Sequence, residues 1–175
     1  MKVLVLGGTG FVGANLYNKL KTSSKYEVYK CSLSTGVDLR VYEQFYDQLR
    51  NINPDIVFNL ASHGGSMLYV REFAADVISD NMLMTLNMYK AINEYNPDIK
   101  IIQPFSNCSY PGNSSVQYES EWLDGDVHKS VFSFGNSKRS MFYLSKCYQM
   151  QYGVKTVNLL FPNTYGPGDS CDPKK

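Results

Sequence analysis

The first thirteen residues, MKVLVLGGTGFVG, constrain the fold of this chain more than any other stretch. Val3–Leu6 is an unbroken apolar run, typical of a strand buried on both faces of a parallel sheet. The residues that follow carry three spaced glycines and open a helical pattern. In such a turn Gly7 permits the tight bend, Gly10 lets a phosphate approach the backbone, and Gly13 lets the helix lie close to the strand. The stretch therefore predicts a dinucleotide pyrophosphate bound at a helix N-terminus.

Strand-like and helix-like segments alternate along the rest of the chain. Apolar strands are expected at 26–31, 55–60, 99–104 and 155–161, and helices at 42–50, 74–95 and 134–152. This alternation predicts right-handed crossovers and an α/β fold, a Rossmann-type doubly wound parallel sheet. Such sheets bind ligands at the carboxyl ends of their strands. The polar loops fall there, at 7–13, 32–38, 60–66, 104–112 and 162–168, and the segments 61–70, 105–112, 113–131 and 162–175 are expected to form no regular element.

Composition narrows the class of protein. The chain of 175 residues, 17 basic and 16 acidic, has a net charge of +1, so neither a nucleic-acid partner nor any other polyelectrolyte is expected. The apolar run breaks at Gly7 with no cleavage site after it, so we expect neither export nor a membrane span. The scattered cysteines indicate free thiols in a reducing, cytoplasmic compartment, and no metal site is expected. They are Cys31, Cys108, Cys147 and Cys171.

Further motifs follow the strands in a fixed order. They are Asp38-Leu39, Asn59–Ser62, Ser106–Pro111, Lys138 and Pro162–Asp169. Together with GGTGFVG they resemble the extended short-chain dehydrogenase/reductases, the NAD-dependent epimerase/dehydratase family that acts on nucleotide sugars. Within it, the stretches ASHGG, SNCSYP and PNTYGPGD are most similar to the GDP-fucose synthases, which epimerise and then reduce a GDP-4-keto-6-deoxymannose.

The resemblance implies NADP or NAD as cofactor and residues 1–175 as an NAD(P)-binding Rossmann domain. Glycines of the first turn would hold the pyrophosphate, and Asp38 would meet the adenine amino group. The implied cofactor-binding residues are Gly7, Thr9, Gly10, Phe11, Val12, Gly13, Asp38, Leu39, Leu60, Ala61, Ser62, Lys138, Pro162 and Asn163. The segment CSLS at the end of the second strand lacks the acidic residue that favours NAD, and it offers a 2′-phosphate Ser32, Ser34 or Lys30, which favours NADP.

The resemblance also implies catalytic positions. Ser106 stands at the place of the family's catalytic serine or threonine, and Cys108 matches an acid/base cysteine of fucose synthases. Lys138 would bind the nicotinamide ribose and lower the pKa of a neighbouring tyrosine. That tyrosine is missing, because the family's Tyr-x-x-x-Lys reads here from Phe134 to Lys138. A phenylalanine has no ionisable group and cannot act as a general acid or base.

Phe134 leaves three interpretations open. It is an engineered exchange that traps a substrate complex, or it marks a natural paralogue that binds a nucleotide sugar without the usual redox step. In the third interpretation Cys108, or water held by Ser106, takes over the proton. Loss of a positioned acid/base is expected to cost roughly 10²–10⁴-fold in rate.

Two rival functions and two structural expectations complete the sequence-based account. The rivals are a non-catalytic dinucleotide-binding protein and a sugar 4,6-dehydratase, the latter disfavoured because Asn107-Cys108 replaces that enzyme's Asp-Glu pair after Ser106. The chain ends where relatives continue, which predicts an N-terminal fragment. It would lack the last strands, the substrate domain and a catalytic histidine, leaving a sheet edge and an apolar face open.

The family resemblance also implies a homodimer through the helices at 74–95 and 134–152. His63 is a candidate for touching the nucleotide-sugar substrate.

Overall fold

The apolar run near the N-terminus forms an inner strand of the sheet, β1 (Lys2–Leu6). Its residues Val3–Leu6 are at most 1% exposed. It pairs in parallel with β2 (Glu27–Cys31) on one side and with β3 (Ile56–Asn59) on the other. The predicted strand buried on both faces is therefore confirmed.

The computed structural model describes residues 1–113 and 115–169, so Cys171 and the end of the segment 162–175 lie outside the described residues. Within these residues the sheet has five parallel strands in the order β2-β1-β3-β4-β5. The remaining strands are β4 (Lys100–Ser106) and β5 (Thr156–Phe161). The helices are α1 (Phe11–Lys21), α2 (Tyr42–Ile52), α3 (Met67–Glu72), α4 (Ala74–Tyr95) and α5 (Phe132–Tyr152).

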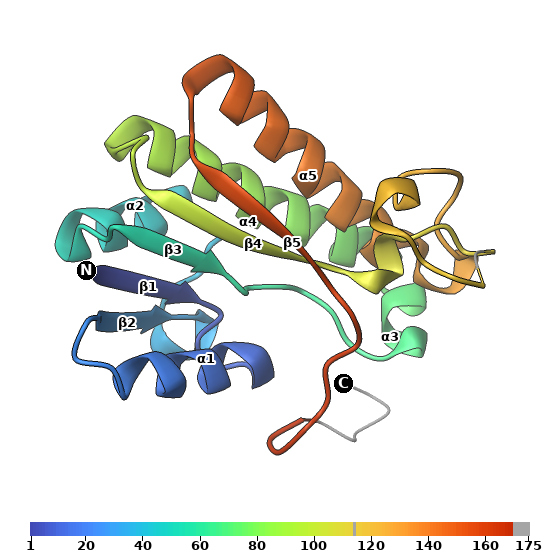
Figure 1. Cartoon of the computed structure of the whole chain (residues 1–175), viewed down its shortest axis with the longest axis horizontal. Helices are drawn as coiled ribbons and strands as arrows, with labels where there is room; N and C mark the ends of the chain where they lie inside the picture. Colours follow the sequence, from blue (N-terminus) through green and yellow to red (C-terminus); the bar gives the residue numbers. More distant parts are fainter. Residues whose placement is uncertain (114, 170–175) are drawn as a thin grey trace.

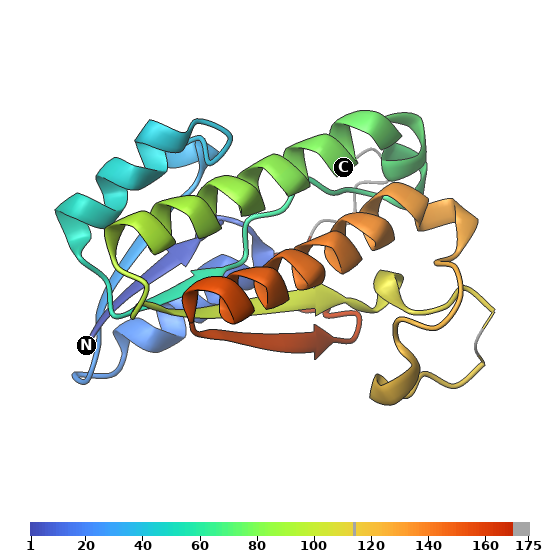
Figure 2. The same ribbon diagram turned by 90° about the horizontal axis from the view of Figure 1, so that it is seen from above.

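Helices cover the two faces of the sheet unequally. Figure 1 shows the five strands side by side, and Figure 2 shows α2, α4 and α5 on one face with α1 on the other. Chain order reverses between β1 and β3, the switch point at which doubly wound sheets open a crevice. The predicted fold class is confirmed.

The main hydrophobic core lies between the sheet and the helices α2 and α4. Phe45 and Leu49 from α2 and Tyr89 and Ile92 from α4 are fully buried against the strands. On the α1 side, a cavity of about 390 Å³ is lined by apolar side chains of β3, β4 and β5, including Phe58, Ile102, Leu159 and Phe161.

Several predicted boundaries are wrong, and α2 extends to Ile52, two residues beyond its predicted end at Arg50. The stretch 61–70 is not a loop throughout, because α3 begins at Met67, where the Ser66 hydroxyl accepts a hydrogen bond from the Tyr69 amide. The fourth strand does not end at Pro104 but continues through Ser106, since β5 pairs with it up to Phe161. The last helix begins at Phe132, two residues earlier than predicted.

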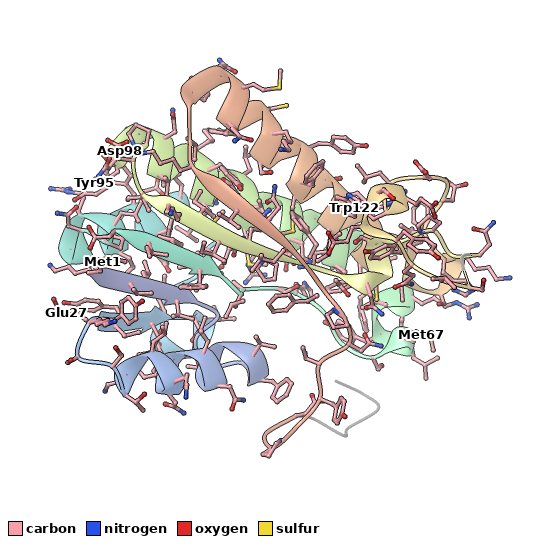
Figure 3. All side chains as sticks on the ribbon, in the orientation of Figure 1. Met1, Glu27, Met67, Tyr95, Asp98 and Trp122 are labelled. Carbon is pink, nitrogen blue, oxygen red and sulfur yellow. The ribbon has the colours of Figure 1, made fainter. Side chains whose placement is uncertain are left out.

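A second aromatic cluster fixes the long segment between β4 and α5. Trp122 packs against Phe142 of α5 with ring centroids 5.0 Å apart, and against Phe105 of β4 at 5.6 Å (Figure 3). The Arg139 guanidinium donates hydrogen bonds to the carbonyl oxygens of Ser109, Trp122 and Gly125. Apart from short 3₁₀ turns the described part of 113–131 is irregular, as predicted, and these contacts anchor it to the carboxyl end of β4.

Candidate active site

The glycines of the β1–α1 turn have different surroundings. Gly7 has a positive φ of 70°, and a side chain there would lie 2.7 Å from the backbone of Leu60 and Ala61. A Cβ on Gly13 would lie 2.2 Å from the Gly7 carbonyl oxygen, so this glycine is required for α1 to dock. Gly10 is not crowded, since the nearest atom to its Cβ would be the Gly7 oxygen at 3.4 Å.

The N-terminus of α1 is free to meet an anion. Gly10 is its N-cap, no side chain caps it, and its first turn holds no acidic residue. Exposed first-turn amides and the helix dipole favour a phosphate at this position. A dinucleotide pyrophosphate therefore fits the turn by its chemistry.

Beside this turn lies a first depression, here called the outer cleft, with a volume of about 620 Å³. It brings together six of the predicted cofactor-binding residues: Gly7, Thr9, Asp38, Leu39, Ala61 and Ser62. They come from the ends of β1 and β3 and from the segment after β2, which the topology places at one edge of the sheet.

Three hydroxyls form a cluster at the β2 end of the outer cleft. The Thr9 hydroxyl lies 2.8 Å from that of Ser32 and 2.9 Å from that of Ser34, and the two serine hydroxyls are 3.0 Å apart. Hydroxyls both donate and accept hydrogen bonds, so the cluster suits a ribose hydroxyl or a phosphate oxygen.

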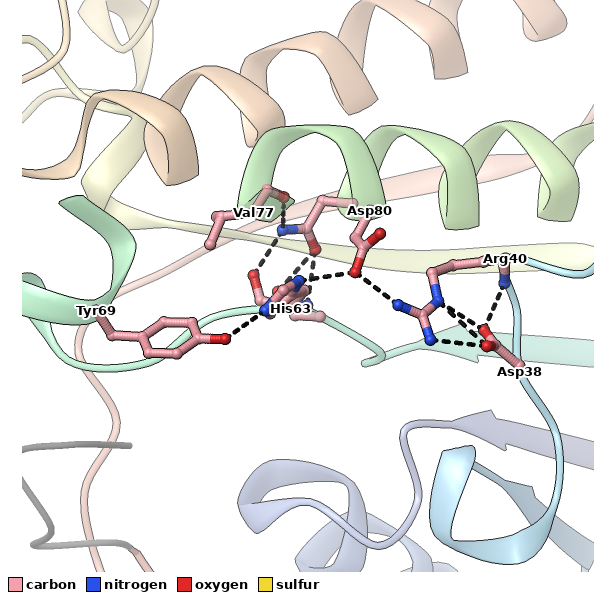
Figure 4. A network of polar contacts seen from close by, with 8 residues as sticks. Asp38, Arg40, His63, Tyr69, Val77 and Asp80 are labelled. Atoms are coloured by element: carbon pink, nitrogen blue, oxygen red, sulfur yellow. Dashed lines mark hydrogen bonds and ion pairs between the residues drawn. The ribbon is translucent and has the colours of Figure 1, made fainter. Parts of the chain in front are cut away.

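A charged network connects Asp38, Arg40, His63 and Asp80, four residues that line the outer cleft (Figure 4). Arg40 holds both carboxylate oxygens of Asp38 and also binds Asp80 at 2.9 Å. Asp80 in turn lies 2.9 Å from Nδ1 of His63, whose Nε2 lies 2.8 Å from the Tyr69 hydroxyl. The guanidinium of Arg40 lowers the pKa of Asp38, so this carboxylate stays charged and is already partnered.

A second depression, the inner pocket, has a volume of about 280 Å³ and adjoins the outer cleft through Ala61 and Ser62. It lies between the carboxyl ends of β3, β4 and β5 and the first turns of α5. The predicted site residues that line it are Val12, Leu60, Ala61, Ser62, Ser106, Phe134, Lys138, Pro162 and Asn163.

Lys138 is buried in the wall of the inner pocket. Its residue is 5% exposed, and its Nζ lies 4.8 Å from the centre of the Phe134 ring. The ammonium donates a hydrogen bond of 2.9 Å to the Ser62 hydroxyl. Burial lowers the pKa of Lys138 to about 8, and the nearby Cys108 side chain opposes this shift without cancelling it.

Ser106 and Cys108 sit on the 3₁₀ turn that follows β4. The Ser106 hydroxyl accepts a hydrogen bond from the Cys108 amide and donates one to the Asn107 side chain, both at 3.2 Å. A Cβ on Gly135 would lie 2.3 Å from the Cys108 carbonyl oxygen. Gly135 thus lets α5 approach this turn closely, which brings Ser106 and Lys138 to the same pocket.

Several predicted residues lie outside both depressions. Phe11 lines the apolar cavity beneath α1, Gly10 and Gly13 shape the turn itself, and Cys108 is half-buried behind Ser106. Sequence reasoning missed Arg40 and Asp80. Arg40 follows Asp38-Leu39 directly, but nothing in the sequence signals that a helical aspartate forty residues later joins it.

The comparisons with known proteins agree with this geometry. The NAD dependent epimerase/dehydratase family matches residues 3–175. The chain belongs to this family. A GDP-L-fucose synthase of Dictyostelium discoideum is 26% identical over 170 residues, which cover 96% of this chain and 53% of that protein. The chain spans about half the length of the curated relatives it matches.

Solved structures of other proteins have a fold similar to that of this chain. The GDP-mannoheptose C4 reductase MlghC from Campylobacter jejuni, solved with NADP bound, has a TM-score of 0.84 at 22% identity, covering 94% of this chain and 48% of that one. The UDP-glucose 4-epimerase of Thermus thermophilus, solved with NAD, has a TM-score of 0.82 at 25% identity, covering 97% and 58%. These structural neighbours of the family thus include both NADP and NAD complexes.

In the described part of the chain no helix is long and apolar enough to cross a membrane. In the same residues, no group of three or more His, Cys, Asp or Glu side chains is arranged to hold a metal ion.

Proposed function

We propose that residues 1–175 form the NAD(P)-binding domain of a nucleotide-sugar epimerase/reductase that acts on a GDP-4-keto-6-deoxy sugar. The observation that carries this proposal is the meeting of Ser106, Lys138 and Ser62 in the inner pocket, directly beside the outer cleft and the β1–α1 turn. The relationship to GDP-L-fucose synthases supports a GDP-sugar as substrate.

The chain's own residues divide the work along the edge of the sheet. Amides at the α1 N-terminus hold the pyrophosphate. Leu39 and Asp38 line the part of the outer cleft that takes the adenine, and Asn163 lines the inner pocket. When bound, the nicotinamide supplies or accepts a hydride. Ser106 orients the sugar oxygen through its hydroxyl, and Cys108 behind it is the candidate acid/base for epimerisation.

We infer a preference for NADP over NAD. No carboxylate stands at the end of β2, where an acidic side chain would bind the ribose 2′-hydroxyl. The hydroxyl cluster of Thr9, Ser32 and Ser34 offers hydrogen-bond donors to a 2′-phosphate instead.

A homodimer is part of the same proposal. Exposed apolar side chains follow helical spacing on α4 and α5, which lie side by side. They are Met82, Leu83 and Leu86 on α4 and Tyr143 and Met150 on α5. Side chains spaced in this way form a continuous stripe that a second copy can cover. A cytoplasmic location goes with the proposed reaction, whose substrates are small soluble metabolites.

A second function has one observation in its favour. Phe134 places a ring without a hydroxyl beside Lys138, as expected for a paralogue that binds a nucleotide sugar without turnover. A dehydratase is less well supported, because Asn107-Cys108 follows Ser106 where that class has an Asp-Glu pair.

Turnover of GDP-4-keto-6-deoxymannose with NADPH separates these functions. For a reductase, slow turnover is expected from the chain as it stands, and Phe134→Tyr is expected to raise it by up to roughly 10²–10⁴-fold. NADPH binding measured by fluorescence titration should be unchanged. Tight NADPH binding without turnover in either protein would favour the non-catalytic paralogue.

A further inference from the structure

The inner pocket needs a proton donor that Phe134 cannot supply. Reduction of a ketone turns the carbonyl oxygen into a hydroxyl, so one proton must reach that oxygen as the hydride reaches the carbon. Among the described residues that line the inner pocket, only one side chain titrates, and it is Lys138. The serines, threonine and asparagine there can donate hydrogen bonds but do not exchange a proton near neutral pH.

From this geometry, resting on the proposed reductase function, we infer that Lys138 itself is the general acid of the reduction. In this step the π bond of the C=O group breaks, and a C–H bond forms with hydride from the reduced nicotinamide. An O–H bond forms with a proton from the ammonium of Lys138. The ketone is reduced, the nicotinamide is oxidised, and the lysine remains as a neutral amine.

The surroundings of Lys138 suit a group that loses and regains a proton. A lysine whose pKa lies near 8 holds a proton at pH 7 and gives it up far more readily than an exposed lysine. Its ammonium donates a hydrogen bond to the Ser62 hydroxyl, which itself donates one of 3.2 Å to the Asn81 side-chain oxygen, and Ser62 borders both depressions. Because Lys138 lines the inner pocket, which adjoins the outer cleft, water that enters the pocket can return the proton to the amine.

Charged groups on the neighbouring elements are engaged elsewhere. His63 binds Asp80 and Tyr69, and Arg139 on α5 binds three carbonyl oxygens of the preceding segment. Cys108 is the group whose charge acts on Lys138, and it raises the pKa against the larger effect of burial. Since Cys108 does not line the inner pocket, it is the less suitable donor of the two.

The test compares Lys138→Arg in two backgrounds. Arginine keeps the positive charge and hydrogen bonds to a ribose, but its pKa, far above that of lysine, makes it a poor acid. With Phe134 present, Lys138→Arg is expected to lower the reduction rate at least about 100-fold. In a Phe134→Tyr background the phenol carries the proton, so the same substitution should cost less than about tenfold. Lys146→Arg, an exposed site on the same helix, is the matched control.

Three further readouts do not depend on turnover of the variants. An NMR titration of the Lys138 ammonium in the cofactor-free chain should give a midpoint near 8, and the NADPH dissociation constant of Lys138→Arg should stay within about fivefold of the parent. The parent reduction rate should fall as pH rises through 8, because the acid is lost.

The following results would overturn the inference. Retained turnover in Lys138→Arg excludes Lys138 as the donor. A midpoint near 10.5, or NADPH binding with no turnover of the parent at any pH, also excludes it while leaving cofactor binding intact. Failure of NADPH to bind the parent chain would instead count against the proposed function.

Discussion

Gly10 and Gly13 stand three residues apart in one turn, yet the space around them differs. A methyl group on Gly13 would overlap the Gly7 carbonyl oxygen at 2.2 Å, whereas one on Gly10 would meet nothing closer than 3.4 Å. Gly10 is therefore open toward the space in which a phosphate would lie, whereas Gly13 is required for the fold.

This difference predicts that alanine at Gly13 mainly lowers stability, whereas alanine at Gly10 mainly weakens cofactor binding. Gly13→Ala should lower the free energy of unfolding by about 1–3 kcal/mol through overpacking. Gly10→Ala should cost less stability, within about 1 kcal/mol for a changed N-cap, but should weaken NADPH binding at least tenfold. Thermal melts and fluorescence titrations measure the two quantities. Unchanged NADPH affinity in Gly10→Ala would contradict the proposed pyrophosphate position.

Lys138 illustrates a cost in stability that a functional position can carry. Its pKa is about 8 in the folded chain, against 10.5 for a free lysine. Below pH 8 Lys138 is protonated in both the folded and the unfolded chain. Between pH 8 and 10.5 it is protonated only in the unfolded chain, so the contribution of Lys138 to the free energy of unfolding rises with pH across this range.

Lys138→Met is therefore expected to have a higher Tm than the parent at pH 7, because it removes a buried charge. This advantage should shrink as the pH rises from 8 toward 10. Denaturant unfolding of both proteins at matched pH values measures the difference. A parent chain that is more stable than the variant at pH 7 would contradict the account of Lys138.

At the scale of elements, the end of β2 controls which cofactor fits. Ser32 follows the strand directly and belongs to the hydroxyl cluster. We predict that Ser32→Asp weakens NADPH binding at least tenfold and improves NADH binding, because a carboxylate repels a 2′-phosphate and accepts a hydrogen bond from a 2′-hydroxyl. Aspartate is also a good N-cap for the 3₁₀ turn that begins at Leu33, so folding should be preserved. Competitive titrations with the two cofactors measure the effect, and an unchanged preference would argue against a cofactor ribose at this cluster.

Elements with a strong hydrophobic pattern were predictable, and elements set by tertiary pairing were not. The apolar runs at β1 and β3 made these two strands predictable, because strands buried inside a parallel sheet need continuous apolar residues. The helix α3 escaped prediction because Gly64-Gly65 and Ser66 favour a loop and only Val70 of its six residues is buried. The extension of β4 to Ser106 depends on its ladder with β5, which no local pattern reports.

The candidate site was predictable as a set of residues but not as an arrangement. Motif order groups Ser106, Phe134 and Lys138 at one candidate site, and all three line the inner pocket. Burial of Lys138, its bond to Ser62 and the network through Arg40 and Asp80 depend on how separate elements meet, and the sequence carries no period or spacing that encodes these contacts.

For the whole molecule, the proposed dimer makes a quantitative prediction. A stable interface of this type buries about 1,200–2,000 Å² in total with an apolar centre. Replacing Leu83 and Leu86 together by glutamate should shift sedimentation from a dimer toward a monomer, because two charges would enter that centre. Val116→Glu, an exposed apolar position outside the two helices, is the control. A parent chain that sediments as a monomer at high micromolar concentration would contradict the dimer.

The position of the cofactor across the sheet edge is the claim on which the other proposals depend. A crystal structure of the chain soaked with NADPH tests it most directly. We predict pyrophosphate density at the amides that begin α1, the adenosine in the outer cleft, and the nicotinamide in the inner pocket within contact distance of Lys138 and Ser106. Density elsewhere, or an empty edge at saturating NADPH, would contradict the account.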